Sequence, residues 1–131
     1  MNRLLILIIL FSANSFSMDE KMKKDMAKQQ GNINQMISDG KKHLMEMKKI
    51  QKACKILKRL KNKKDCPEFS EQIQEKVAYV KNSLDGLKHP FWAYLKGAAK
   101  YAQFCGSCDP RAQEKFCPLM DKALKRYDAI Y

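Results

Sequence analysis

The chain of 131 residues contains few of the residue patterns on which catalytic sites are built. Its two histidines, His43 and His89, are far in sequence from the five cysteines, so no Cys/His zinc spacing is present. Ser-His-Asp, paired-carboxylate and glycine-rich phosphate signatures are also absent. We therefore expect no metal, no cofactor and no enzyme activity.

Long hydrophobic runs are absent, apart from a short one near the start, Leu4 to Phe11. This run is too short to span a bilayer, and it lies between the basic Arg3 and the small residues that lead to Ser17. That order is typical of a cleaved secretory signal. We expect residues 1–17 to be the signal peptide and residues 18–131 to be a single helical domain without a transmembrane segment. The mature protein is then periplasmic or secreted.

No segment alternates apolar and polar residues for long enough to be a strand, whereas apolar residues recur at helical intervals along most of the chain. The expected helices cover about residues 20–38, 41–62, 66–85, 90–105, 110–116 and 118–130. The first two could also be continuous through a bend at Gly40. The residues expected to face inward in the third and last helices are Phe69, Ile73, Val77, Val80 and Leu84, and Leu119, Ala123, Leu124 and Tyr127. The sequence thus predicts an all-α fold, a small disulfide-stapled bundle of about four main helices.

The expected helix over residues 90–105 holds much of the aromatic content, with small residues around Gly97 at its centre. Core packing is the first interpretation of this composition. The alternative is a cleft that would make the protein a small secreted carrier of an apolar ligand, and its lining would be Phe91, Trp92, Tyr94 and Tyr101.

Three of the five cysteines lie close together between Phe104 and Pro118. Gly106 is placed to end a helix by adopting a positive φ, and Asp109 followed by Pro110 is an N-cap and a first helical residue. This segment is therefore expected to be a corner between helices.

In a short exported chain, cysteines indicate disulfides more readily than metal ligands. If a helix ends near residue 62, Cys54 lies roughly 12 Å before that end, too far from Cys66 for a bond that needs Cα atoms within about 7 Å. Antiparallel packing brings the remaining four to one end of the bundle. We predict two disulfides among Cys66, Cys105, Cys108 and Cys117, with Cys54 free and buried.

A weak internal repeat offers a different pairing, because each of two Cys-Pro pairs follows another cysteine at a spacing of twelve residues. That repeat would pair Cys54 with Cys66 and Cys105 with Cys117.

Cys105 and Cys108 also form a C-x-x-C motif, which permits a thiol-disulfide redox or folding factor. Cys105 would lie at a helix C-terminus, where the helix dipole disfavours a thiolate, so Cys108 is the better placed thiol. Asp109 stands where c-type haem attachment requires histidine, which excludes that cofactor.

Acidic residues are nearly missing from one part of this basic chain, whose formal net charge is +12. Between Lys41 and Lys64 there are eleven basic residues and a single acidic one, Glu46. Six of the basic residues fall within about 80° of arc on a helical wheel, opposite an apolar stripe. These six, which we call the basic ridge, are Lys41, Lys48, Lys52, Lys55, Arg59 and Lys63.

A solvated helix face normally mixes charges of both signs, because lysines three or four residues apart repel each other. The one-sided ridge therefore indicates an acidic partner, which could be an acidic polymer, an anionic lipid surface or an acidic protein. Nucleic acid is less favoured, since the ridge has no aromatic side chain on which bases could stack. The predicted function is that of a non-enzymatic, exported binding protein.

Overall fold

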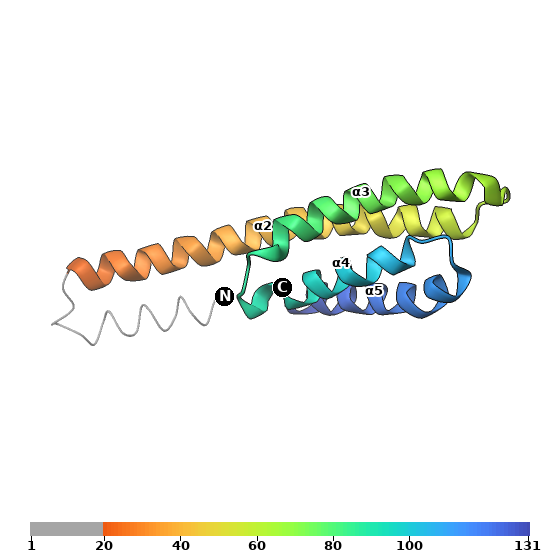
Figure 1. Ribbon diagram of the computed structural model, residues 1–131. Helices are drawn as coiled ribbons and strands as arrows, with labels where there is room; N and C mark the ends of the chain where they lie inside the picture. Colours follow the sequence, from red (N-terminus) through yellow and green to blue (C-terminus); the bar gives the residue numbers. More distant parts are fainter. Residues whose placement is uncertain (1–19) are drawn as a thin grey trace. The chain divides into compact units, whose positions relative to one another are not determined.

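A computed structural model describes residues 20–131 and shows an all-α fold, as the sequence predicts. Four α-helices and two short 3₁₀ helices follow one another, and no strand occurs in this part of the chain (Figure 1). The elements are α2 (Glu20–Lys58), η1 (Lys63–Asp65), α3 (Cys66–Asp85), η2 (Pro90–Trp92), α4 (Ala93–Cys105) and α5 (Pro110–Ile130). The predicted signal peptide, residues 1–17, lies outside the described residues.

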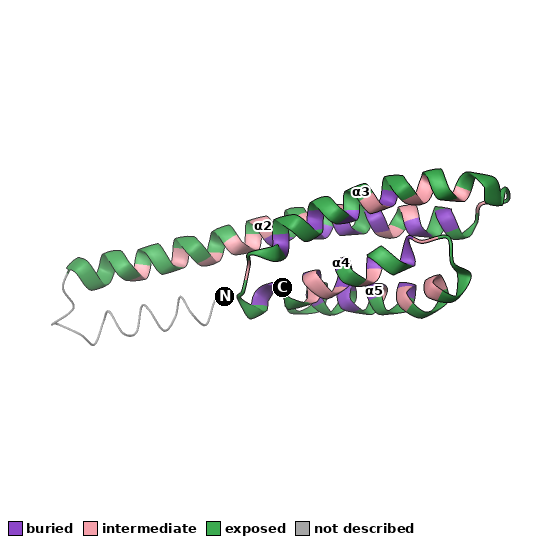
Figure 2. Cartoon of the chain, in the orientation of Figure 1, coloured by how far each residue is buried: buried purple, intermediate pink, exposed green. Residues whose placement is uncertain are grey.

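The chain divides into two units, one up to Met36 and one from Ile37 to Tyr131. In the first unit, residues 20–36 of α2 include no buried residue. The second unit contains the hydrophobic core, to which the rest of α2 and the other three α-helices each contribute one buried stripe (Figure 2). In α2 this stripe is Leu44, Met47, Ile50, Cys54 and Leu57, and in α3 it is Ile73, Val77, Val80 and Leu84.

Helix α2 is continuous, so the predicted interruption at Gly40 is wrong and the alternative of one helix is right. Gly40 is buried, and a Cβ added there would overlap the Tyr127 hydroxyl and come within 2.9 Å of the Phe91 ring. Glycine at this position therefore allows α2 to pack closely against Tyr127 and Phe91. Helix α2 also ends at Lys58, four residues earlier than predicted.

Helix α5 is likewise one helix, although two were predicted on either side of Pro118. Proline in a helix removes the hydrogen bond to the carbonyl four residues earlier, here that of Glu114. Both residues are exposed, so water can reach that carbonyl. The burial of Cys117 and Met120 on either side of the proline holds the helix in place.

The prediction that Leu119 faces inward is wrong, because this residue is 36% exposed. The inward stripe is Cys117, Met120, Ala123, Leu124 and Tyr127. Leu119 lies roughly 100° away from Met120 on the helical wheel, at the edge of this stripe. In α3, the predicted bounds agree with the structure, and Phe69 is half-buried while the other four predicted residues are buried.

Candidate binding surface on helix α2 and the cysteine corner

The basic ridge is exposed along its whole length, since all six of its side chains lie on the surface. Lys41, Lys48, Lys52 and Lys55 belong to α2 and lie opposite its buried stripe. Burial of that stripe fixes the rotation of the helix about its axis, and this rotation directs the four lysines to solvent. The apolar pattern of α2 therefore positions its charges.

The end of α2 at Lys58 changes the last part of the ridge. The Arg59 N–H donates to the Ile56 carbonyl at 3.0 Å, and the Leu60 N–H donates to the Leu57 carbonyl at 3.3 Å, so the last turn tightens and the helix stops. Arg59 follows this turn directly, whereas Lys63 belongs to η1. The prediction that Lys63 continues the helical row is thus wrong, and four residues of the ridge form a row on α2.

Helix α5 partly neutralises the ridge, which the sequence does not reveal. Lys48 Nζ lies 3.4 Å from Asp128 Oδ2, and both side chains are about half exposed. Exposed pairs of this kind contribute roughly 0–1 kcal/mol. Within residues 20–131 no ion pair involves the other five ridge residues. Most of the ridge is therefore available to an external anion.

Two large apolar side chains lie beside the ridge, and sequence reasoning missed both. Met45 is 61% exposed and Ile56 is 53% exposed. At 100° per residue, Met45 lies roughly 50° and Ile56 roughly 70° from the centre of the lysine row. The helical wheel of α2 contains this information, but a pattern of charge alone does not include these two residues. The surface therefore combines cations with exposed apolar groups.

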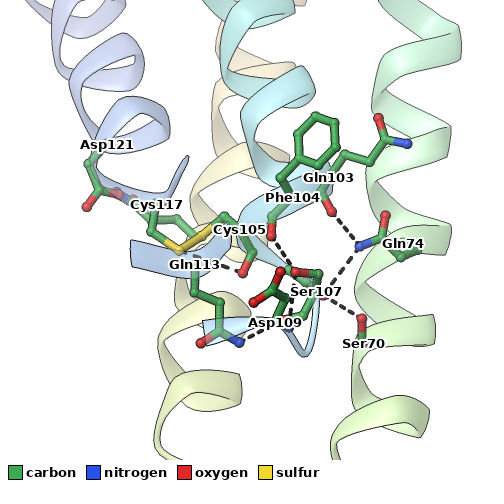
Figure 3. Close-up of a disulfide and its surroundings, with 12 residues drawn as sticks. Ser70, Gln74, Gln103, Phe104, Cys105, Ser107, Asp109, Gln113, Cys117 and Asp121 are labelled. Carbon is green, nitrogen blue, oxygen red and sulfur yellow. Dashed lines mark hydrogen bonds between the residues drawn. A yellow bond between two sulfur atoms is a disulfide. The ribbon is translucent and has the colours of Figure 1, made fainter. Parts of the chain in front are cut away.

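The three cysteines of the corner and Cys66 form two disulfides, and Cys54 is free and buried. Cys105 is joined to Cys117, with Cα atoms 4.8 Å apart, and Figure 3 shows this bond linking α4 to α5. Cys66 is joined to Cys108, with Cα atoms 6.0 Å apart. The pairing of Cys54 with Cys66 that the repeat suggested is wrong, because α2 continues past Cys54 to Lys58.

Helix α3 holds the start of the corner through hydrogen bonds from Ser70 and Gln74, both of which Figure 3 shows. Ser70 Oγ donates to the Gly106 carbonyl at 2.5 Å, and Gln74 Nε2 donates to the Gln103 carbonyl at 2.8 Å. Gly106 has φ −85°, so the predicted positive φ is wrong. A Cβ here would lie 2.5 Å from Ile73 Cγ2, which is why the position suits glycine.

The end of the corner is capped as predicted. Asp109 Oδ1 accepts the Arg111 N–H at 3.0 Å, which satisfies a free donor in the first turn of α5. Gln113 Nε2 donates to the Ser107 carbonyl at 2.6 Å. The corner is therefore held by hydrogen bonds as well as by the two disulfides.

This arrangement gives little support to thiol redox chemistry. The two cysteines of the C-x-x-C motif are bonded to different partners, and neither is bonded to the other. The remaining thiol, Cys54, is buried. Burial, followed by the nearby Asp121 carboxylate and opposed by Lys58, raises its pKa to about 11. A neutral, buried thiol is a poor nucleophile.

No known protein family, curated protein or solved structure matches this chain significantly. No helix among residues 20–131 is both long and apolar enough to cross a membrane. The same residues contain no cluster of three His, Cys, Asp or Glu side chains that could hold a metal ion.

The structure separates the four aromatic residues that the carrier alternative placed in one cleft. Phe91 and Trp92 are buried, with ring centroids 4.8 Å apart in an edge-to-face arrangement, and they belong to the core. Tyr94 and Tyr101 are half-buried and line an open groove between α4 and α5. Of these four aromatic residues, only Tyr94 and Tyr101 are therefore placed to contact a ligand.

Proposed function

We propose that this is a non-enzymatic, exported helical protein that binds an acidic partner through the basic ridge of α2. The observation that carries the proposal is the exposed row of lysines on the side of α2 opposite its buried stripe. From Lys41 to Lys55 this row extends roughly 21 Å at 1.5 Å per residue. A row of this length suits a partner with repeated negative charges.

Binding by such a surface is necessarily multivalent. A single exposed ion pair contributes about 0.2–1 kcal/mol, so several cations must act together to give useful affinity. The interaction should also weaken with salt, because exposed charges are screened over about 8 Å at physiological ionic strength.

Among the acidic partners, an anionic lipid surface is favoured over an acidic polymer or an acidic protein. Met45 and Ile56 are exposed beside the lysines, and apolar side chains gain free energy when they enter the acyl boundary below charged headgroups. A hydrophilic polymer offers these two residues no apolar contact. Nucleic acid remains less favoured, because no aromatic residue belongs to the ridge.

The two disulfides support an oxidising compartment, the periplasm or the outside of the cell. Together with the predicted signal over residues 1–17, they lead us to expect a mature chain that starts at Met18. Intact mass of the exported protein tests this. Retention of Met1 on a reduced protein in the cytosol would refute the proposed location.

The test of the binding surface replaces Lys48, Lys52, Lys55 and Arg59 together by glutamine. Wild-type protein should sediment with anionic vesicles at low salt and be released at high salt, whereas the variant should not bind. The matched control removes four exposed cations elsewhere, at Lys76, Lys81, Lys100 and Lys125, and should bind nearly as wild type. Equal losses in the two variants would show that net charge alone matters and would contradict the ridge.

A further substitution identifies the kind of partner. Ile56→Gln should weaken binding to anionic vesicles and leave binding to a soluble polyanion such as polyglutamate unchanged, because only the vesicle offers an apolar phase. If the substitution weakens neither, the lipid assignment is wrong and an acidic polymer or protein is the better partner.

A further inference from the structure

A second surface, separate from the basic ridge, has the features of a small-molecule site. It is a groove of about 330 Å³ between α4 and α5. Its principal lining residues are Tyr94, Gly97 and Tyr101 of α4, and Leu119, Lys122 and Arg126 of α5. The volume is at the lower end of the range for small-ligand sites, which is about 300–1,000 Å³.

The groove exists because its floor is made of small residues. A Cβ added at Gly97 would contact only the Tyr101 ring, at 3.9 Å, so the space above this residue is open. Ala93 and Ala123 also line the groove. The Cys105–Cys117 disulfide joins α4 to α5 near one end. The walls are thus held by a covalent bond and do not depend on a ligand.

The two ends of the groove differ in chemistry. The Cys105–Cys117 bond, whose Cα atoms are 4.8 Å apart, sets the register of α4 against α5, and these helices form an antiparallel hairpin (Figure 1). Leu119 lies two residues after Cys117, near this bond. Lys122 and Arg126 follow farther along α5, towards the end of the groove at Tyr94. The end near the disulfide is therefore apolar, and the groove becomes cationic away from it.

Two of the three acidic side chains of α5 contact α2, and the third, Glu114, does not line the groove. Asp121 Oδ1 accepts a hydrogen bond from Gln51 Nε2 of α2 at 2.6 Å, and Asp128 pairs with Lys48 of α2. No acidic residue lines the groove, and within residues 20–131 neither Lys122 nor Arg126 forms an ion pair. The two cations at this end are therefore uncompensated.

We propose that this groove binds an amphipathic anion, a free carboxylate that carries an apolar chain. Lys122 and Arg126 would hold the carboxylate, for which the guanidinium fork is well suited. The chain would lie over Gly97, between Tyr101 and Leu119. Charge at one end and apolar contact at the other favour this ligand over a polyanion, which would need cations along the whole groove. The inference stands whether or not the basic ridge binds a partner.

Titration with decanoate, followed by the NMR signals of the Gly97 amide and of the tyrosine rings, tests the proposal. We expect saturable shifts at Gly97 and Tyr101. The quadruple glutamine variant of the basic ridge should bind decanoate as the wild type does. Unchanged groove signals at saturating decanoate in the wild type would overturn the proposal.

Gly97→Leu provides a block that does not depend on charge. A leucine side chain here would occupy the floor of the groove, and it should not lower the melting temperature because leucine has the higher helix propensity. Decanoate shifts should be lost. Gly31→Leu, in a part of α2 where an added Cβ meets nothing within 4 Å, is the matched control and should bind normally. Equal binding by both variants would contradict the site.

Removal of the cations tests the headgroup. Lys122→Gln with Arg126→Gln should weaken decanoate binding at least roughly fivefold, since two charged contacts are lost. Lys96→Gln with Lys100→Gln removes the same charge outside the groove and should have little effect. Binding of 1-decanol as tight as that of decanoate would show that the cations do not select the ligand, and would refute the assignment of an anion.

Discussion

Removal of either disulfide should destabilise the protein strongly, and the two should differ in mechanism. The residues of the Cys66–Cys108 bond are 42 apart in sequence, and those of the Cys105–Cys117 bond are 12 apart. Loop-closure entropy then assigns about 4 kcal/mol to the first bond and about 3 kcal/mol to the second. Both values are large against a typical unfolding free energy of about 5–15 kcal/mol.

Burial should reduce this difference between the two bonds. Cys105 and Cys117 are buried, whereas Cys66 is half-buried and Cys108 is exposed. Changing the buried pair to alanine removes two sulfur atoms from the core and leaves a small cavity. This cavity should add about 1 kcal/mol to the loss of unfolding free energy. We therefore expect each double alanine variant to lose about 4 kcal/mol, the loss being entropic at Cys66–Cys108 and partly due to packing at Cys105–Cys117.

Urea unfolding of the two variants, each compared with the oxidised wild type, measures these losses. Partial reduction with a mild thiol, followed by peptide mapping, separates the mechanisms. The Cys66–Cys108 bond should open first, because the reductant can reach Cys108 directly. A loss below about 1 kcal/mol for the Cys66/Cys108 variant, or first opening of the Cys105–Cys117 bond, would refute the reasoning.

Further predictions concern two helix glycines, Gly40 and Gly97, and the buried Cys54. Gly40→Ala should lower the unfolding free energy by about 1–2 kcal/mol, since the new Cβ would overlap the Tyr127 hydroxyl. At Gly97 an added Cβ would meet only the Tyr101 ring, at 3.9 Å. Gly97→Ala should therefore raise the unfolding free energy by about 0.8 kcal/mol, because alanine has the higher helix propensity. Urea unfolding should show changes of opposite sign for the two variants. The pKa of Cys54 rises from 9.0 to about 11, so its stabilising effect should be complete below pH 9 and be lost as the pH rises towards 11. Cys54→Ala should reduce the fall of the unfolding free energy between pH 9 and 11. The same fall in the variant as in the wild type would contradict this.

The helical fold could be predicted because apolar periodicity is a local signal that survives into the tertiary structure. The bounds of α3 and the Asp109 cap follow from this kind of local information. Gly40 and Pro118 were misjudged because their effects depend on neighbours distant in sequence. Gly40 faces Tyr127 and Phe91, and Pro118 follows the buried Cys117, which is bonded to Cys105 of α4.

The candidate surfaces were predictable to different degrees. The exposed lysines of the basic ridge follow from the rotation of one helix, which its own sequence determines. The groove between α4 and α5 could not be predicted, since it depends on the register of two helices and on Leu119 lying at the edge of the core stripe. The pairing of Lys48 with Asp128 joins residues 80 apart, and no local pattern indicates it.

The cost of placing like charges along α2 is small compared with the free energy that positions them. Each pair of lysines three or four residues apart costs a few tenths of a kcal/mol, whereas burying each of Met47, Ile50 and Leu57 contributes about 1.5–3 kcal/mol. Repulsion along the basic ridge, and the attraction that we propose between the ridge and an anionic surface, are screened by the same salt. Added sodium chloride should therefore raise the melting temperature slightly over the range in which vesicle binding disappears. The quadruple glutamine variant should lose both responses, and a melting temperature that rises equally with salt in this variant would show that the repulsion lies elsewhere.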